Sequence, residues 1–182
     1  MKIISNFVDG KLTNVKPSGF IPLFKPTTGE EYAHVPITTQ LEFEEIIRKM
    51  KFAQKSWAET AITKRSNILF KFKSLIEKDF DNIAKIISEE HGKVFSDAKG
   101  SLQRGLEVVD FACGIPHLLK GNHSINVGTN VDSYDVRQSL GICAGITPFN
   151  FPAMVPMWMF PLSIACGNAF MLKPSEKIPQ CS

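Results

Sequence analysis

The chain has 182 residues, and 21 Lys and Arg against 18 Asp and Glu give it a formal net charge of +3 at pH 7. A charge this small and dispersed argues against a nucleic-acid binder. Lys2, Asp9 and Lys11 interrupt an amino terminus without an apolar core, and no arginine precedes Arg48. We therefore expect neither a secretory signal nor a mitochondrial presequence, and place the protein in a bacterial-type cytoplasm or, after processing, in a mitochondrial matrix.

Hairpins and helices are predicted in residues 1–123. An Asp-Gly pair in residues 7–12 predicts a two-residue hairpin turn, and residues 24–35 read as strand, Pro-Thr-Thr-Gly turn and strand. Thr39 and Glu42 have the spacing of a capping box that opens a helix. Further helices are predicted at about 64–78 and 81–91, and a longer one at about 96–119 that ends near Gly114-Ile115-Pro116. Residues 124–137 are polar and rich in β-forming residues, which predicts exposed strands.

Residues 138–172 contain no charged side chain, so this segment is expected to be buried in protein or in lipid. Prolines and glycines divide it, and no second apolar segment or aromatic belt accompanies it, which argues against a membrane span. Its pieces predict a strand at 140–146, a helix at 152–166 and a strand at 169–173. This order is typical of the opening βαβ half-unit of a parallel sheet that is covered on both faces.

Polar residues follow both predicted strands, at 147–150 and 173–176. Because ligands of parallel sheets bind beyond the carboxyl ends of the strands, these groups would gather on one edge. A carboxylate such as Glu176 can accept both ribose hydroxyls and would repel a 2′-phosphate, which favours NAD over NADP, and Lys173 adds a cationic donor. The usual glycine fingerprint is missing. On the residues alone, a nucleotide site and a solvated turn both stay open.

Three runs carry a family resemblance: PFNFP at 148–152, GN at 167–168 and LKPSE at 172–176. Together they resemble the paired signature of the aldehyde dehydrogenase superfamily. Within it, FPAMVPMWMFP at 151–161 and RGLEVV at 104–109 resemble the CoA-acylating methylmalonate-semialdehyde dehydrogenase branch, whose enzymes act in valine, thymine and inositol breakdown. The resemblance implies an α/β fold in which helical and β segments lead into a Rossmann-like parallel sheet.

The resemblance also implies roles for particular residues. Asn150 matches the asparagine whose side-chain amide meets the developing oxyanion, and is the catalytic residue expected in this chain. The cofactor NAD would be contacted by five residues: Thr147, Phe149, Lys173, Glu176 and Lys177. Arg104 matches an arginine that binds the carboxylate of the substrate, through two parallel hydrogen bonds that a lysine could not make. Coenzyme A would be the co-substrate.

The nucleophilic cysteine of the family has no counterpart among Cys113, Cys143, Cys166 and Cys181. Their irregular spacing fits reduced intracellular thiols better than a disulfide framework or a metal site. The four histidines are scattered as well, so no metal is expected. We therefore expect the chain to be an amino-terminal fragment that is catalytically silent alone.

The expected organisation has three parts. Residues 1–123 would form the first part of the NAD-binding domain, 124–137 the oligomerisation strands, and 138–182 the first strand-helix-strand of the NAD-binding sheet, with the catalytic domain absent. An exposed strand edge of this kind favours a dimer or tetramer. Two alternatives stay open: a non-catalytic module that keeps assembly strands and weak nucleotide affinity, and a dehydrogenase of another small aldehyde.

Overall fold

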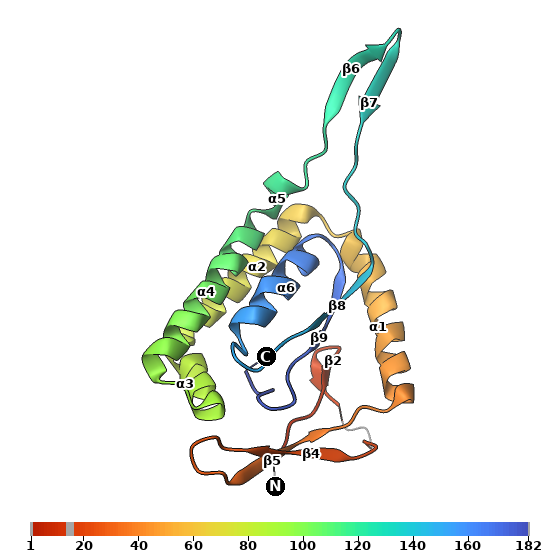
Figure 1. The fold of residues 1–182 in the computed structure, drawn as a ribbon. Helices are drawn as coiled ribbons and strands as arrows, with labels where there is room; N and C mark the ends of the chain where they lie inside the picture. Colours follow the sequence, from red (N-terminus) through yellow and green to blue (C-terminus); the bar gives the residue numbers. More distant parts are fainter. Residues whose placement is uncertain (1, 14–16, 182) are drawn as a thin grey trace.

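The computed structural model describes residues 2–13 and 17–181, and begins with two small β structures (Figure 1). In one sheet, β5 (Glu31–Pro36) lies between the parallel β1 (Lys2–Ile3) and the antiparallel β4 (Phe20–Phe24). The other is the hairpin of β2 (Phe7–Val8) and β3 (Lys11–Leu12). Both residues of its Asp-Gly turn have positive φ, at 54° and 73°, as a two-residue type I′ hairpin requires. The predicted turn is confirmed.

The first long helix, α1 (Gln40–Ala58), opens at the predicted cap. The Thr39 hydroxyl accepts a hydrogen bond from the Glu42 N–H at 3.2 Å. The second half of the capping box does not form, because the Glu42 carboxylate instead accepts hydrogen bonds from the side chains of Asn6 at 3.2 Å and Thr13 at 3.4 Å. This buried carboxylate therefore ties the start of α1 to the amino-terminal hairpin.

Two more predicted helices are confirmed within a few residues, and the fourth is split. They are α2 (Ile62–Lys78) and α3 (Phe80–His91), and α3 ends at Gly92 with φ 83°. The single helix expected at 96–119 is two: α4 (Phe95–Cys113) and α5 (Ile115–Leu118). They separate at Gly114 because Pro116 cannot donate a helical hydrogen bond, and the Ser66 hydroxyl caps the carbonyl of Cys113 at 2.6 Å.

The expected exposed strands form a hairpin, β6 (His123–Gly128) and β7 (Val131–Tyr134). It projects well beyond the rest of the molecule (Figure 1). Every residue of both strands is exposed, including Ile125, Val127 and Val131. The hairpin therefore presents apolar side chains that nothing in the described chain covers.

The charge-free segment forms β8 (Ile142–Ile146), α6 (Met154–Ala165) and β9 (Ala169–Lys173), with β8 and β9 paired in parallel. The predicted strand-helix-strand order is confirmed. The first strand starts two residues later than predicted, because the Asn168 side-chain oxygen accepts from the N–H groups of Leu140 and Gly141, at 2.7 and 3.0 Å. Gly141, at φ 115°, completes this turn.

The main core lies where α4 crosses α6, and it is built from Leu102, Leu106, Val109, Ala153 and Met157, with α3 adding Ile87. Gly105 is the closest point of the crossing: an added Cβ would lie 3.1 Å from the Met154 Cα. Without this glycine the two helices could not approach so closely.

The strand pair is covered less fully than predicted. One face of β8 packs on α6, where an added Cβ on Gly145 would meet Met159. On the other face Ile146 is 77% exposed, because α1 lies mainly against β9. Two covered faces are expected of a complete parallel sheet, and the second face of β8 is not covered at Ile146 in the described chain. No helix in the described ranges is long and apolar enough to cross a membrane.

The far end of α6 is capped by side chains from two other helices. Arg65, 7% exposed, donates to the carbonyls of Ala165 at 3.0 Å, Ala58 at 3.2 Å and Thr60 at 2.9 Å. The Trp57 indole N–H donates to the Ile164 carbonyl at 2.9 Å. The Ala165 and Ala58 carbonyls lie at the ends of α6 and α1, where a helix leaves its last carbonyls without a partner, so Arg65 caps both helix ends.

Candidate functional site

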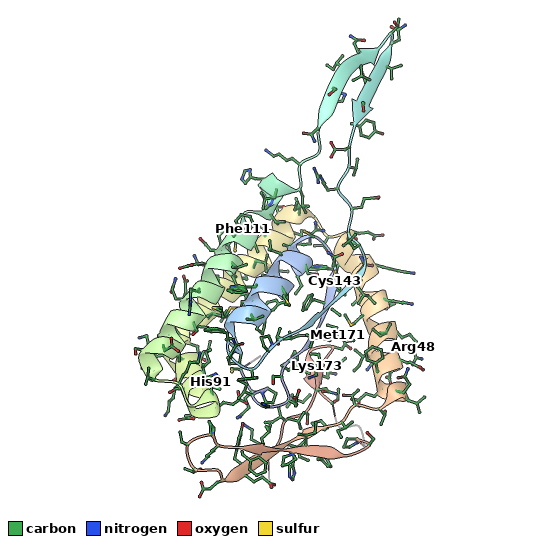
Figure 2. The ribbon with its side chains drawn as sticks, viewed as in Figure 1. Arg48, His91, Phe111, Cys143, Met171 and Lys173 are labelled. Carbon is green, nitrogen blue, oxygen red and sulfur yellow. The ribbon has the colours of Figure 1, made fainter. Side chains whose placement is uncertain are left out.

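The polar residues that follow β8 and β9 lie at one edge of the strand pair. Ile146 is in register with Lys173, and the Thr147 N–H donates to the Lys173 carbonyl at 3.1 Å. Because the strands are parallel, the loop 147–153 and the turn 174–177 leave the same edge, which we call the rim. In Figure 2, Lys173 lies at the rim end of the pair, and Cys143 lies toward the opposite end. The predicted gathering of these segments is confirmed.

At the rim, Lys173 and Glu176 form an ion pair. The Lys173 Nζ lies 2.8 Å from a Glu176 carboxylate oxygen, and both side chains are about half exposed, at 56% and 46%. The hydrogen bond from Lys173 holds the pKa of Glu176 below its usual range. Glu176 is therefore an accessible anion at neutral pH with a cationic donor beside it.

Phe149 and Lys177 join the loop to the turn. The Lys177 Nζ lies 4.8 Å from the centroid of the Phe149 ring, within the range of a cation–π contact. The Lys177 N–H also donates to the Ser175 hydroxyl at 3.2 Å, so the turn is closed locally. Thr147 is only 4% exposed, and its hydroxyl has no hydrogen-bond partner in the described chain. Its side chain is thus withdrawn from solvent, which leaves its main chain for the expected ligand contact.

Asn150 is exposed on the loop. Its backbone carbonyl accepts a hydrogen bond from the Lys93 Nζ at 3.1 Å. Its side-chain amide makes no hydrogen bond with any residue in the described ranges. The main chain at Asn150 is therefore held, while the side-chain amide of this exposed residue is a donor without a hydrogen-bond partner in the described ranges.

Arg104 comes to this loop from α4. Its guanidinium carbon lies 5.4 Å from the centroid of the Phe151 ring, next to Asn150. Its only polar contact with the described chain is from Nε to the Gly100 carbonyl of its own helix, at 3.4 Å. The outer guanidinium nitrogens of the exposed Arg104 are thus available beside Phe151, the residue that follows Asn150 in the chain. The close α4–α6 crossing at Gly105 brings Arg104 to the Phe151 ring.

Three of the four cysteines are protected thiols. Burial raises the pKa of Cys113, Cys166 and Cys181, and the Glu90 carboxylate adds to the effect at Cys181. A raised pKa keeps a thiol protonated at neutral pH, the opposite of what a nucleophile needs. Among the described residues no group of three or more His, Cys, Asp or Glu is placed to hold a metal ion.

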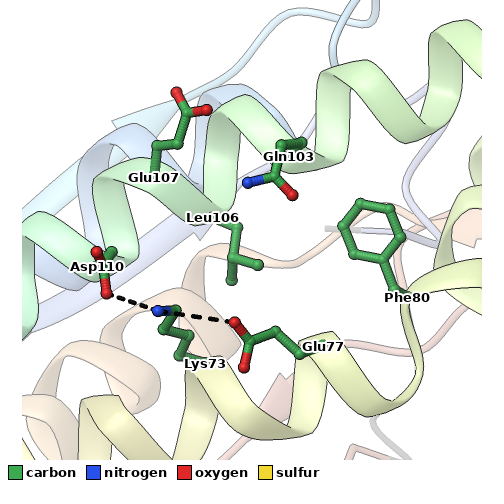
Figure 3. A pocket seen from close by; sticks show the side chains of 7 residues that line it. All are labelled: Lys73, Glu77, Phe80, Gln103, Leu106, Glu107 and Asp110. Atoms are coloured by element: carbon green, nitrogen blue, oxygen red, sulfur yellow. Dashed lines mark hydrogen bonds and ion pairs between the residues drawn. The ribbon is translucent and has the colours of Figure 1, made fainter.

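Two hollows lie away from the rim. One of about 240 Å³ opens between α2 and α4, beside an ion pair of Lys73 with Asp110 at 2.7 Å and Glu77 at 3.6 Å (Figure 3). Another of about 380 Å³ lies between the turn at Asp9 and α1. Neither is lined by a residue predicted to act.

Lys93 is the rim contact that sequence analysis missed. Its ammonium reaches both the Asn150 carbonyl and the Phe151 ring, whose centroid is 4.5 Å away. The only available signal was a lysine directly after the helix-ending Gly92, a position where basic residues are common for reasons unrelated to a site. The contact joins residues 57 positions apart, so local pattern could not reveal it.

Comparison with known proteins gives matches over most of this chain. The aldehyde dehydrogenase family model matches residues 14–182. A probable methylmalonate-semialdehyde/malonate-semialdehyde dehydrogenase [acylating] from Dictyostelium discoideum is 47% identical over 97% of this chain and 33% of its own length. A malonate-semialdehyde dehydrogenase from Pseudomonas aeruginosa is 50% identical over 86% of this chain and 32% of its own length.

Solved structures give the same result. A putative methylmalonate-semialdehyde dehydrogenase from Sinorhizobium meliloti, complexed with NAD, superposes with a TM-score of 0.96 at 43% identity. The enzyme of the same name from Oceanimonas doudoroffii also superposes with a TM-score of 0.96, at 45% identity. Each match covers 100% of this chain and 37% of the other.

The chain therefore spans about a third of the length of the relatives it matches. Their names confirm the resemblance to the methylmalonate-semialdehyde dehydrogenase branch, and their fold confirms the expected α/β class. With most of its length matched by the family model and superposed on these structures, the chain belongs to the aldehyde dehydrogenase family.

Proposed function

We propose that this chain supplies the nucleotide-binding rim, an oxyanion donor and a substrate-binding arginine to an NAD-dependent, CoA-acylating dehydrogenase of methylmalonate or malonate semialdehyde. One observation carries the proposal. The free amide of Asn150, the Lys173–Glu176 pair and the exposed Arg104 reach the same edge of a parallel strand pair from three separate segments. The names of the relatives supply the substrate and the acylating reaction.

The rim residues fit the adenosine half of NAD. Glu176 is an exposed anion that can accept both ribose hydroxyls, and Lys173 can donate to the same ribose. A carboxylate in this position disfavours the 2′-phosphate of NADP. Lys177, held at Phe149, adds positive charge close by, and the main chain of Thr147 and the Phe149 ring complete the surface. NAD, when bound, supplies the hydride acceptor.

Asn150 and Arg104 would bind different groups of the aldehyde substrate. The Asn150 amide would donate to the carbonyl oxygen as negative charge develops on it, and loss of such a donor costs about 10²–10³ in rate. The guanidinium of Arg104 would hold the distal carboxylate through two parallel hydrogen bonds. Because Arg104 has no ion-pair partner among the described residues, it needs no competing contact to be broken first.

Acyl transfer to coenzyme A, with the substrate carboxylate lost as carbon dioxide, would yield propionyl-CoA or acetyl-CoA, as expected of enzymes in valine, thymine and inositol breakdown. The support is the word "acylating" in the name of the Dictyostelium relative. We also propose that the β6–β7 hairpin pairs subunits into a dimer or tetramer, since its exposed apolar residues need a covering surface. A bacterial cytoplasm or a mitochondrial matrix would suit this activity.

The test is an NADH assay on the longest protein that the gene encodes, with methylmalonate semialdehyde and coenzyme A. We expect absorbance at 340 nm to rise only when both are present, with a thioester product in the mass spectrum, and more slowly with NADP. Equal rates without coenzyme A would overturn the acylating reaction. The 182-residue chain is expected to be silent, and turnover above an Asn150→Ala control would refute that.

Arg104→Leu tests the substrate class in the same assay. We expect KM for methylmalonate semialdehyde to rise about tenfold or more, the loss typical of a charged hydrogen-bonded pair, while propanal oxidation stays unchanged. Unchanged preference for carboxylated aldehydes would remove the assignment of Arg104. That result would favour another small aldehyde as the substrate.

A further inference from the structure

The backbone of Lys93 is held in place by its neighbours. It follows Gly92, whose φ of 83° turns the chain out of α3, and an added Cβ on Gly92 would lie 3.0 Å from Pro26. The Ser88 hydroxyl donates to the Lys93 carbonyl at 2.6 Å. The backbone from which the side chain extends is therefore fixed by a helix end, a side-chain hydrogen bond and a packed proline.

The side chain is 8% exposed, which is unusual for a lysine. Its ammonium has three donors, and three acceptors surround it: the Asn150 carbonyl at 3.1 Å, an Asp97 carboxylate oxygen at 3.5 Å and the Ser101 hydroxyl at 3.5 Å. The Phe151 ring centroid lies 4.5 Å away. Almost the whole contact set of this charge is therefore on α4 and on the loop that carries Asn150.

The Asn150 carbonyl links the contacts of Lys93 to the residue that is proposed to act in the reaction. A hydrogen bond to the carbonyl, together with the cation–π contact to the next ring, fixes the main chain on the carboxyl side of the Asn150 Cα. The torsion about the Cα–C bond and two side-chain torsions then separate the fixed carbonyl from the amide. A donor aimed at an oxyanion must be in place before the charge develops.

We propose that Lys93 is a positioning residue that holds the Asn150 amide in its donating orientation, and that it contacts neither substrate nor cofactor. The inference rests on the proposed role of Asn150. Arg104 lies within 6 Å of the same Phe151 ring. Lys93 thus sets the spacing between the oxyanion donor and the carboxylate-binding arginine through a shared aromatic residue.

The first test is independent of activity and uses the 182-residue chain. In a ¹⁵N–¹H NMR spectrum, the side-chain amide pair of Asn150 is identified by its absence in Asn150→Ala. Lys93→Met is expected to shift or broaden this pair. Lys99→Met is the matched control, because Lys99 also has an ion pair, with Asp81 at 2.8 Å, and aromatic contacts, but none to the loop.

The second test uses turnover in the longest encoded protein. Lys93→Met is expected to lower kcat about 10- to 100-fold, the range for a misplaced catalytic group, with little change in KM for NAD. In an Asn150→Ala background the same substitution should cost less than about twofold, because the group it positions is gone. Lys93→Arg, which keeps a donor, should recover part of kcat and also covers the case that Lys93→Met does not fold.

The outcomes separate the two proposals. Unchanged Asn150 amide resonances in both Lys93→Met and Lys99→Met would overturn the positioning role, whatever the activity. An equal loss of kcat in the presence and absence of the Asn150 amide would overturn it too, since it would show a general structural effect. An absence of dehydrogenase activity with a shifted Asn150 amide in Lys93→Met would overturn the proposed function and leave the contact established.

Discussion

Two glycines in α4 are predicted to change the stability of the chain in opposite directions when each is replaced by alanine. Gly105 lies at the crossing with α6, where an added Cβ would be 2.7 Å from the Met157 Cε and 3.1 Å from the Met154 Cα. Gly100 is exposed on the same helix, and an added Cβ there would meet nothing within 4 Å. Replacement of either glycine by alanine improves helix propensity by about 1 kcal/mol, so that contribution cancels in the comparison.

The difference in unfolding free energy between the two variants therefore measures the cost of adding a methyl group where α4 crosses α6. The Met157 methyl group can rotate away, but the Met154 Cα is backbone and yields only if α6 moves. Overpacking of this kind costs about 1–3 kcal/mol. We therefore expect Gly100→Ala to be more stable than the parent chain, and Gly105→Ala to be less stable than Gly100→Ala by about 1–3 kcal/mol. For a chain of this size that gap corresponds to about 2–12 °C in Tm.

The measurement is thermal unfolding followed by circular dichroism at 222 nm, with the three proteins at one concentration and one scan rate. Urea unfolding gives the free energies directly. Equal stability of the two alanine variants would refute the close crossing of α4 and α6. It would also weaken the placement of Arg104 beside Phe151, which depends on the same approach.

Two further predictions concern buried polar groups. Arg65→Met removes three hydrogen bonds to backbone carbonyls, two of them at helix ends, so urea unfolding should show a loss of about 2–4 kcal/mol. The exposed neighbour Lys64→Met should lose less than about 0.5 kcal/mol, and equal losses would contradict the cap. Burial first, and then the Glu90 carboxylate, raise the pKa of Tyr32 from 10.0 to about 12. The folded chain therefore binds this proton more tightly than the unfolded chain, and the resulting stability is present below pH 10 and lost as the pH rises through about 12. The Tm of the parent chain should fall more steeply over that interval than the Tm of Tyr32→Phe, and parallel curves would contradict the shift.

The strand-helix-strand and its common edge could be predicted because the signals are local. A long run without charge, divided by prolines and glycines, leaves few alternatives, and parallel strands place Asn150 and Glu176 on one edge once their order is known. Gly114 and Pro116 signalled the end of α4, but the short α5 was not predicted as a separate helix.

Other features depend on contacts between distant segments. Arg65 reads in sequence as a surface charge on a helix, yet it is buried because the ends of α1 and α6 meet beside it. The contact of Lys93 with Asn150 depends in the same way on where α3 ends relative to the loop. The exposure of Ile146 follows from the position of α1 against β9, which the pattern of a single strand cannot report.

The capping of α6 is unequal at its two ends. Trp57 and Arg65 secure its last carbonyls, whereas Ala153, at its start beside the rim, provides no side-chain cap. Local opening should therefore begin at the rim and fade along the helix, with amide protection increasing toward Ala165. At its rim end α6 is held by packing on α4 at Gly105 and not by a side-chain cap, so the loop in front of it can adjust to an arriving nucleotide only within the hold that Lys93 keeps on Asn150.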